Sequence, residues 1–251
     1  MSVSAMPDEV AVAAAIRLCR GLLALTAHRG SIEGVAHLIV GPEVAHHVHD
    51  PDGLVGSGEG EELRVVLPAL LAHQIHGSHR SPWQLALPQP GQLGGLRGPA
   101  SLTQQALAAG AAVLGNDLAL LPHPVGPALQ WVVLPAQLPI PPEGPREAEQ
   151  ALQRLLIESG DALGERHGTA ADRPQPSEAP HFPATSAPAQ RALDRAWRWW
   201  WLAEAGLVAD PAYSSHGSAQ RDQVLRRLRD AARAAVAAAA STPVVSAPDG
   251  P

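Results

Sequence analysis

The fold is decided by residues 83–114, whose sequence is W83-QLALPQPGQLGGLRGPASLTQQALAAGAAV-L114. Trp83–Leu87 is a short apolar run that predicts a buried strand, and Ala100–Leu114 has the residue spacing of a helix. A loop rich in glycine and proline joins the two. Strands that alternate with helices build layered α/β domains, so a mixed sheet with flanking helices is expected.

The rest of the chain extends this pattern in both directions. Helices are predicted over residues 8–28, 68–76, 145–166, 189–205 and 218–240, and strands over 34–40, 43–49 and 129–134. The predicted organisation is a mixed α/β domain over 1–167, a proline-rich linker over 168–188, a C-terminal helical hairpin over 189–241 and a disordered tail over 242–251. The predicted fold class is therefore α/β or α+β, with a layered mixed sheet followed by a helical hairpin.

Composition excludes several classes of protein. The 251 residues include no lysine, so the chain has no side-chain ε-amine for a Schiff base and no lysine for a P-loop or a protein kinase. Its one cysteine, Cys19, cannot form an intramolecular disulfide. No apolar run reaches the roughly 18 residues of a membrane-spanning helix, and residues 1–9 lack the basic start of a signal peptide. We therefore predict a cytoplasmic protein with no membrane partner.

The charge distribution gives no reason to expect nucleic-acid binding. Residues 1–188 carry 10 Arg against 18 Asp and Glu, whereas residues 189–240 carry 8 Arg against 5 Asp and Glu. An acidic body repels nucleic acid, and the small basic excess on the last helices is typical of a solvated helix face. No nucleic-acid partner is predicted.

The glycine-rich loop Leu87–Pro99 is the most unusual local feature. It leaves a predicted strand and enters a predicted helix, where backbone N–H groups and the helix dipole can hold an anion. In this hypothesis Gly94, Gly95 and Gly98 form the cradle, and Arg97 contacts a phosphate or carboxylate. The glycines do not follow the G-x-G-x-x-G order of dinucleotide-binding proteins. A tight structural loop whose glycines adopt positive φ remains the alternative.

The same loop carries a resemblance. It is similar to a loop, roughly L-P-x-P-G-D-x-x-G-L-x-G-P, in an actinobacterial protein family of unknown activity. In that family, as predicted here, the loop follows a strand and precedes a helix with an alanine-glycine pair, matched by Ala109–Gly110. This chain has Gln92 where such sequences tend to have an acidic residue. The resemblance implies an α/β layout and no particular activity.

Two groups of histidines raise a metal site as a weaker alternative. His47 and His49 would share one face of a strand, and His73 and His76 one face of a helix. Zinc sites normally add a further ligand at fixed spacing, but H-E-x-x-H and a cysteine pair are both absent from the sequence. Exposed histidines are the simpler interpretation, so neither a metal nor a cofactor is predicted.

The aromatic residues gather near the C-terminus, where Trp197 and Trp199–Trp201 account for four of the six tryptophans. At about 100° per residue, Trp197, Trp200 and Trp201 share one apolar stripe, whereas Trp199 points elsewhere. Two amphipathic helices do not make an independent core, so they must pack on the first domain or on a partner. Trp199 and the adjacent Trp200 are the predicted interface residues.

These observations favour a non-catalytic interaction or accessory protein. It would associate with a second copy or with another protein through its C-terminal helices. The alternative is a small-ligand binder or enzyme that uses the loop at 91–98 as an anion or phosphate cradle. No catalytic set of residues is complete in the sequence, and enzymatic activity is left open.

Overall fold

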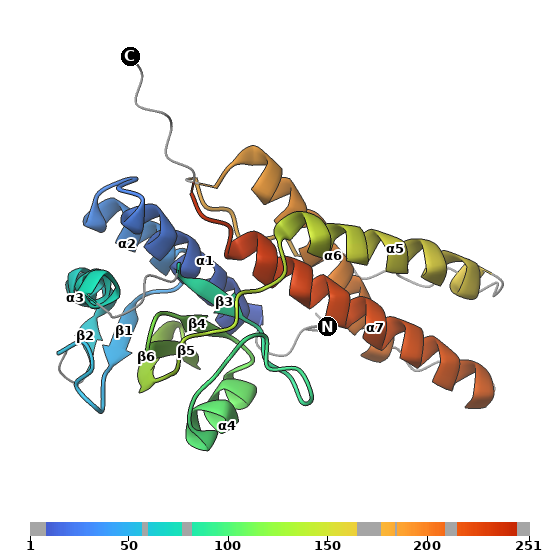
Figure 1. Cartoon of the computed structure of the whole chain (residues 1–251), viewed down its shortest axis with the longest axis horizontal. Helices are drawn as coiled ribbons and strands as arrows, with labels where there is room; N and C mark the ends of the chain where they lie inside the picture. The colour runs from blue at the N-terminus through green and yellow to red at the C-terminus, as the bar shows by residue number, and fades with distance from the viewer. Residues whose placement is uncertain are drawn as a thin grey trace, which may run out of the picture. The chain divides into compact units, whose positions relative to one another are not determined.

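The computed structural model describes residues 9–56, 60–76, 82–164, 177–183, 185–208 and 215–244 (Figure 1). Its contacts divide the chain into two compact units. The sheet unit consists of residues 8–142, 180–187 and 240–251, and the helical unit of residues 1–7, 143–179 and 188–239. The predicted domain boundaries stay a prediction, and parts of the predicted linker and tail lie outside the described residues.

The sheet unit contains helices α1 (Glu9–Thr26), α2 (Ile32–Val40), α3 (Leu63–His76) and α4 (Ala100–Ala109). Its strands are β1 (His46–His49), β2 (Glu61–Glu62), β3 (Gln84–Ala86), β4 (Ala112–Leu114), β5 (Leu118–Val125) and β6 (Ala128–Pro135). The described strands form one six-stranded sheet in the order β2-β1-β6-β5-β4-β3. β1 and β6 are parallel and the other neighbours are antiparallel, so the predicted mixed sheet is confirmed.

The centre of the sheet is buried on both faces because helices cover both. α4 packs against one face through a cluster that joins Leu102 and Ala106 to alternate residues of β4 and β5. α1 contacts β3, β4 and β5, and Figure 1 shows α1 and α4 on opposite sides of these strands. Strands covered on both faces are apolar at every position rather than at alternate ones, and every residue of β4 is buried.

α1 is the central helix of this unit, and the prediction of a helix over residues 8–28 is confirmed. Its side chains are buried around almost the whole circumference, including those of Arg17 and Arg20, which are 7% and 2% exposed. A charged side chain at such a depth requires polar partners. These two arginines therefore mark the places where other segments of the chain bring oxygen atoms to α1.

The predicted strand over residues 34–40 is wrong, because this segment is helix α2. Ser31 is the N-cap and its hydroxyl accepts a hydrogen bond from the amide of Gly34. Val35, Ala36 and Ile39 form the buried face, which is the spacing of a helix and not of a strand. A serine followed by a glutamate in the first turn, Glu33, is a signal for the start of a helix. The strand prediction relied on the apolar residues of 34–40 and gave this signal no weight.

Two helix predictions had wrong limits. α3 begins at Leu63 instead of Pro68, which lies exposed inside the helix. The predicted helix over 100–114 ends at Ala109, because Gly110 adopts a left-handed conformation with φ of 71° and caps it. The chain then enters β4, so this segment contains a helix end and a strand.

β5 was not predicted because it contains two prolines. It pairs with β6 along its whole length, through a turn at Gly126–Pro127. The first residue of this turn, Gly126, has φ of 58°, as a two-residue hairpin turn of this kind requires. The predicted strands at 83–87 and 129–134 correspond to β3 and β6, and the C-terminal half of the predicted strand at 43–49 corresponds to β1.

The helical unit contains α5 (Pro145–Gly164), α6 (Ala187–Val208) and α7 (Ser215–Ala240). α6 and α7 form the predicted C-terminal helical hairpin, and α5 lies in the same unit. Its packing residues include Leu193, Trp197 and Trp200 of α6 and Leu228 and Val236 of α7, all buried. Of the helices that the structure describes, none has the length and apolar character to cross a bilayer.

Candidate functional site

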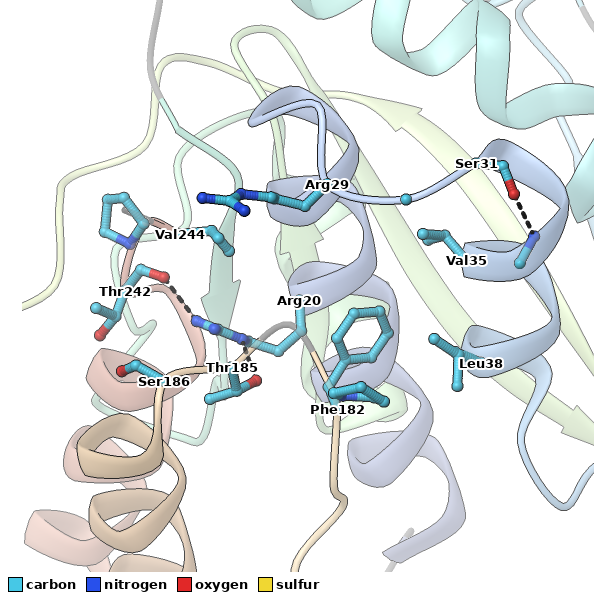
Figure 2. Close-up of a pocket in the computed structure, with 14 residues that line it drawn as sticks. Arg20, Arg29, Ser31, Val35, Leu38, Phe182, Thr185, Ser186, Thr242 and Val244 are labelled. Atoms are coloured by element: carbon cyan, nitrogen blue, oxygen red, sulfur yellow. Dashed lines mark hydrogen bonds between the residues drawn. The ribbon is translucent and has the colours of Figure 1, made fainter. Parts of the chain in front are cut away.

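The sheet unit contains a cavity of about 760 Å³ (Figure 2). Its wall is formed by α1, by α2 and the turn before it, and by residues 182–183, 185–186 and 242–244 from the C-terminal half of the chain. The lining residues that carry the arguments below are Arg20, Arg29, Val35, Leu38, Phe182 and Thr185. Concave sites of several hundred Å³ are the size that accommodates small ligands.

Arg20 is the most deeply buried charged residue of this wall. Its Nε donates to the hydroxyl oxygen of Thr185 at 3.0 Å, and its Nη1 donates to the carbonyl oxygen of Thr242 at 2.6 Å. A longer contact of 3.5 Å joins Nη1 to the carbonyl oxygen of Ala240. All three acceptors are uncharged, and no Asp or Glu of the described residues pairs with Arg20.

The guanidinium of Arg20 keeps its positive charge in this environment. Burial lowers the pKa of Arg20 from its ordinary value, but an arginine starts so high that it stays protonated at neutral pH. The neighbouring Cys19 does not neutralise it, because burial raises the pKa of that thiol to about 12. The cavity wall therefore contains a buried positive charge without an anionic partner among the described residues.

Arg29 brings a second positive charge to the same wall. It is exposed, and the structure gives its guanidinium no hydrogen-bond or ion-pair partner among the described residues. In Figure 2 the side chains of Arg20 and Arg29 both point toward residues 242–244. The described lining contains two arginines and no acidic residue, so its electrostatic potential attracts anions.

The opposite end of the cavity is apolar. Phe182 and Val35 are buried, at 2% and 3% exposure, and Leu38 is 36% exposed. A second cavity of about 850 Å³ shares Gly30 and Pro243 with the first, but no arginine or acidic residue lines its described wall. Of these two large cavities, the one around Arg20 combines positive charge with an apolar surface.

The glycine-rich loop is packed against the segment that follows β6. The amide of Ile140 donates to the carbonyl of Gly95 at 3.0 Å, and the amide of Gln137 donates to that of Arg97 at 2.9 Å. A Cβ on Gly95 would lie 2.3 Å from the carbonyl oxygen of Ile140, and one on Gly98 would lie 2.7 Å from Leu102. Packing therefore accounts for the glycines at 95 and 98.

Gly94 of the same loop has φ of 61°, which favours glycine. The side chain of Arg97 is exposed and does not line the cavity around Arg20. The anion cradle predicted for Gly94, Gly95, Arg97 and Gly98 stays a prediction, at a place separate from that cavity.

The histidines of the weaker metal alternative lie on two elements. His47 and His49 occupy the same face of β1, and the Nδ1 of His47 lies 3.2 Å from the carbonyl oxygen of Gly60. His73 on α3 pairs with Asp117 at 2.5 Å, and His76 ends the same helix. Within the described parts of the chain, no three His, Cys, Asp or Glu side chains are grouped as metal ligands would be.

A different histidine, His46, belongs to a buried chain of hydrogen bonds. The indole Nε1 of Trp131 donates to Nδ1 of His46 at 3.2 Å. Because an indole only donates, Nδ1 accepts and the proton of neutral His46 is on Nε2, which faces Glu43 at 3.4 Å. Glu43 also pairs with Arg17, whose Nε donates to the carbonyl of Ile39 at 2.9 Å. These contacts join β6, β1, α2 and α1.

The two predicted interface residues differ in exposure. Trp200 is 2% exposed, packs edge-on against Trp197 with ring centroids 5.7 Å apart, and has the guanidinium of Arg233 4.7 Å from its ring. Trp199 is half-buried in a small hollow of the helical unit beside Leu152 of α5 and Ala235 of α7. Of the two, Trp199 is the one that retains accessible surface.

Sequence reasoning did not single out Arg20, although a signal was present. Arg20 lies inside the stretch from Ile16 to Leu25, in which Arg17 and Arg20 are the charged residues among a mostly apolar run. A charge in such a run indicates a buried cation that needs partners. Its actual partners, Thr185 and Thr242, lie more than 160 residues further along the chain, so sequence proximity could not identify them.

A family model described as "Rv1486c-like protein, N-terminal domain" matches residues 22–149. No curated protein and no solved structure matches the chain. The matched residues include the glycine-rich loop and the α2 side of the cavity wall. The match agrees with the expected actinobacterial family, and it does not test the loop pattern on which that resemblance was based.

Proposed function

The chain belongs to the Rv1486c-like protein family, and we propose that its sheet unit binds a small anionic ligand in the cavity around Arg20. The observation that carries the proposal is the buried guanidinium of Arg20, which lines this cavity and has only uncharged acceptors among the described residues. The proposal is for binding, with no chemical step.

The energetic argument begins with the burial of a charge. Transferring an ion from water into a protein interior costs several kcal/mol unless hydrogen bonds and an opposite charge offset it. The acceptors from Thr185, Thr242 and Ala240 offset part of this cost. A bound anion would offset more, because it places an opposite charge beside the guanidinium, which uncharged acceptors do not supply.

Arg29 supports the same proposal from the rim. Its exposed guanidinium can meet an anion before the ligand is buried, which increases the rate of association. The position of Arg29 also makes it suitable for mutation. Its side chain has no described partner to lose, so replacing it should not disturb folding.

The proposal is tested by thermal denaturation of the full chain with inorganic phosphate, pyrophosphate and short carboxylates. We expect a stabilising shift that grows with anion concentration, is reduced in Arg29→Met and is retained in the matched control Arg97→Met. Loss of the shift in Arg97→Met with retention in Arg29→Met would instead place the anion at the glycine-rich loop. Unchanged melting curves with every anion would refute binding at both places.

Association through the C-terminal helices is the second candidate function. It is supported by apolar side chains on the helical unit, since Ile157 of α5 is 73% exposed and Val208 of α6 is 63% exposed. Trp199 adds a partly exposed aromatic surface. We expect native mass spectrometry to detect an oligomer that Trp199→Ala or Ile157→Glu converts to monomer. An association state unchanged by both substitutions would count against these helices as the interface.

A further inference from the structure

We infer that the ligand of the cavity around Arg20 is an amphiphilic carboxylate, with one carboxylate group joined to an apolar body. This inference rests on the proposed function and specifies its ligand. The inference follows from the two ends of the cavity. The basic end has few free donors, and the apolar end would stay unfilled if a small inorganic ion were bound.

The donors at the basic end match a single carboxylate. A guanidinium has five N–H groups, and Arg20 directs Nε to Thr185 and Nη1 to Thr242 and Ala240. Only Nη2 has no acceptor among the described residues. Nη2 of Arg20 and the guanidinium of Arg29 together offer enough N–H groups for the two oxygens of a carboxylate. A pyrophosphate or a nucleotide chain presents more charge and more acceptors than this set can meet.

The hydroxyl groups that line the basic end, those of Thr185, Ser186 and Thr242, are uncharged, and each has a single hydrogen to donate. The hydroxyl oxygen of Thr185 accepts from Arg20, which leaves its hydrogen free to donate once. Ser31, whose hydroxyl oxygen accepts from the amide of Gly34 and caps α2, lies beside Val35 and not at the basic end (Figure 2). No lysine or histidine lines the described wall. Arg20 is the buried positive charge of this end and Arg29 is an exposed one, so the buried part of the basic end is suited to one negative charge.

The apolar end is suited to a hydrocarbon or aromatic group. Phe182, Val35 and Leu38 lie together on the side of the cavity away from the two guanidinium groups (Figure 2). A water molecule takes about 30 Å³ of liquid volume, so a cavity of about 760 Å³ is much larger than a phosphate ion needs. An apolar body would displace water from these side chains, with a gain in affinity of about fourfold for each methylene group buried.

The experiment is titration calorimetry of the full chain with butanoate, hexanoate and octanoate. Octanol serves as the uncharged probe, and pyrophosphate as the charged probe without an apolar body. We expect affinity to rise with chain length among the acids, and octanol and pyrophosphate to bind at least tenfold more weakly than octanoate. Equal binding of octanol and octanoate, or affinity independent of chain length, would overturn the inference.

Substitutions separate the two ends of the site. Arg29→Met should weaken all three acids by a similar factor, because it removes charge and leaves the apolar end intact. Leu38→Glu should abolish the gain with chain length. Val125→Glu, which also places a glutamate at an exposed apolar position but lies on β5 outside the cavity, should leave the gain unaltered. An unchanged chain-length dependence in Leu38→Glu would place the apolar body elsewhere and overturn the inference.

The outcomes also distinguish the inference from the proposed function. Suppose that pyrophosphate binds, that octanoate does not, and that Arg29→Met abolishes the binding of pyrophosphate. The proposed anion site would then be supported, and an amphiphilic carboxylate would be refuted as its ligand. Binding of none of these anions would refute the proposed function and the inference together.

Discussion

Arg20 on α1 donates from Nε to the hydroxyl oxygen of Thr185, which lies 165 residues further along the chain, at a distance of 3.0 Å. The same guanidinium holds the carbonyl of Thr242. One side chain of the central helix thus fixes two segments that return to the sheet unit from the C-terminal half of the sequence. The wall of the proposed binding site is made by these contacts.

Replacing Thr185 with valine should destabilise the protein. Valine has nearly the same shape but leaves the charged Nε of Arg20 without its acceptor, which costs about 1–3 kcal/mol of unfolding free energy. Thr185→Ser keeps the hydroxyl and is the matched control, with a smaller loss. Urea denaturation measures the difference. Equal midpoints for the valine and serine variants would show that this hydrogen bond contributes nothing.

Gly95→Ala should be more damaging than Gly91→Ala, although the two glycines have almost the same φ, 86° and 87°. The left-handed backbone alone costs an alanine about 1–2 kcal/mol at either position. At Gly95 the new methyl group would also meet the carbonyl oxygen of Ile140, whereas at Gly91 nothing lies within 4 Å. We expect about 1–3 kcal/mol more destabilisation at Gly95, measured by chemical denaturation.

Glu43 should make stability depend on pH in the acid range. Burial raises the pKa of Glu43, but the hydrogen bond from His46 and the charge of Arg17 outweigh it, so the pKa lies below its ordinary value. The unfolded chain, with a glutamate pKa of about 4.3, therefore takes up a proton at a higher pH than the folded protein does. The stabilisation is present above about pH 4.3 and is lost as the pH falls through the lower folded value.

This dependence is measured by comparing unfolding free energies of the wild type and Glu43→Gln at neutral pH and at about pH 3. The wild type should lose more stability than the variant over this interval, because glutamine does not titrate. Parallel pH profiles for the two proteins would mean that the contacts with Arg17 and His46 do not hold the carboxylate in its charged form.

Cys19 should be unreactive in the folded protein. It is fully buried, and burial raises the pKa of its thiol to about 12, so the thiolate that reacts with disulfide reagents is scarce at pH 8. We expect labelling by Ellman's reagent to proceed at the rate of unfolding, and to be complete within the mixing time in strong denaturant. Rapid labelling of the native protein would contradict the buried position of this residue.

The sequence predicted elements well where the pattern was local and uninterrupted. α1, α5, α6 and α7 were expected from apolar spacing, and the fold class followed from strands that alternate with helices. Errors arose where a few residues override the apolar pattern. The cap formed by Ser31 makes α2 a helix, and Gly110 ends α4 so that a strand can follow.

The candidate site was beyond sequence reasoning because its partners are distant in the chain. Arg20 could have been recognised as a buried cation, but its acceptors come from Thr185 and Thr242. Those contacts depend on how the C-terminal segments return to the sheet unit. Similarly, the sequence suggests Gly95 and Gly98 as part of an anion cradle. Only the structure shows that Ile140 and Leu102 leave no room for a side chain at these two positions.

The prolines of β5 have a consequence for unwanted strand pairing. Leu118 uses its carbonyl toward β4, since it accepts from the amide of Gly115 at 2.9 Å. The backbone N–H and C=O groups alternate in direction along a strand, so the backbones of Pro122 and Pro124 face the same side as that of Leu118. Both prolines lie beyond Leu120, the last residue of β5 that pairs with β4. An open edge normally offers a row of N–H groups on which a foreign strand can grow. Pro124 is exposed and removes one of those donors, so the outer end of this hairpin is a poor template for aggregation.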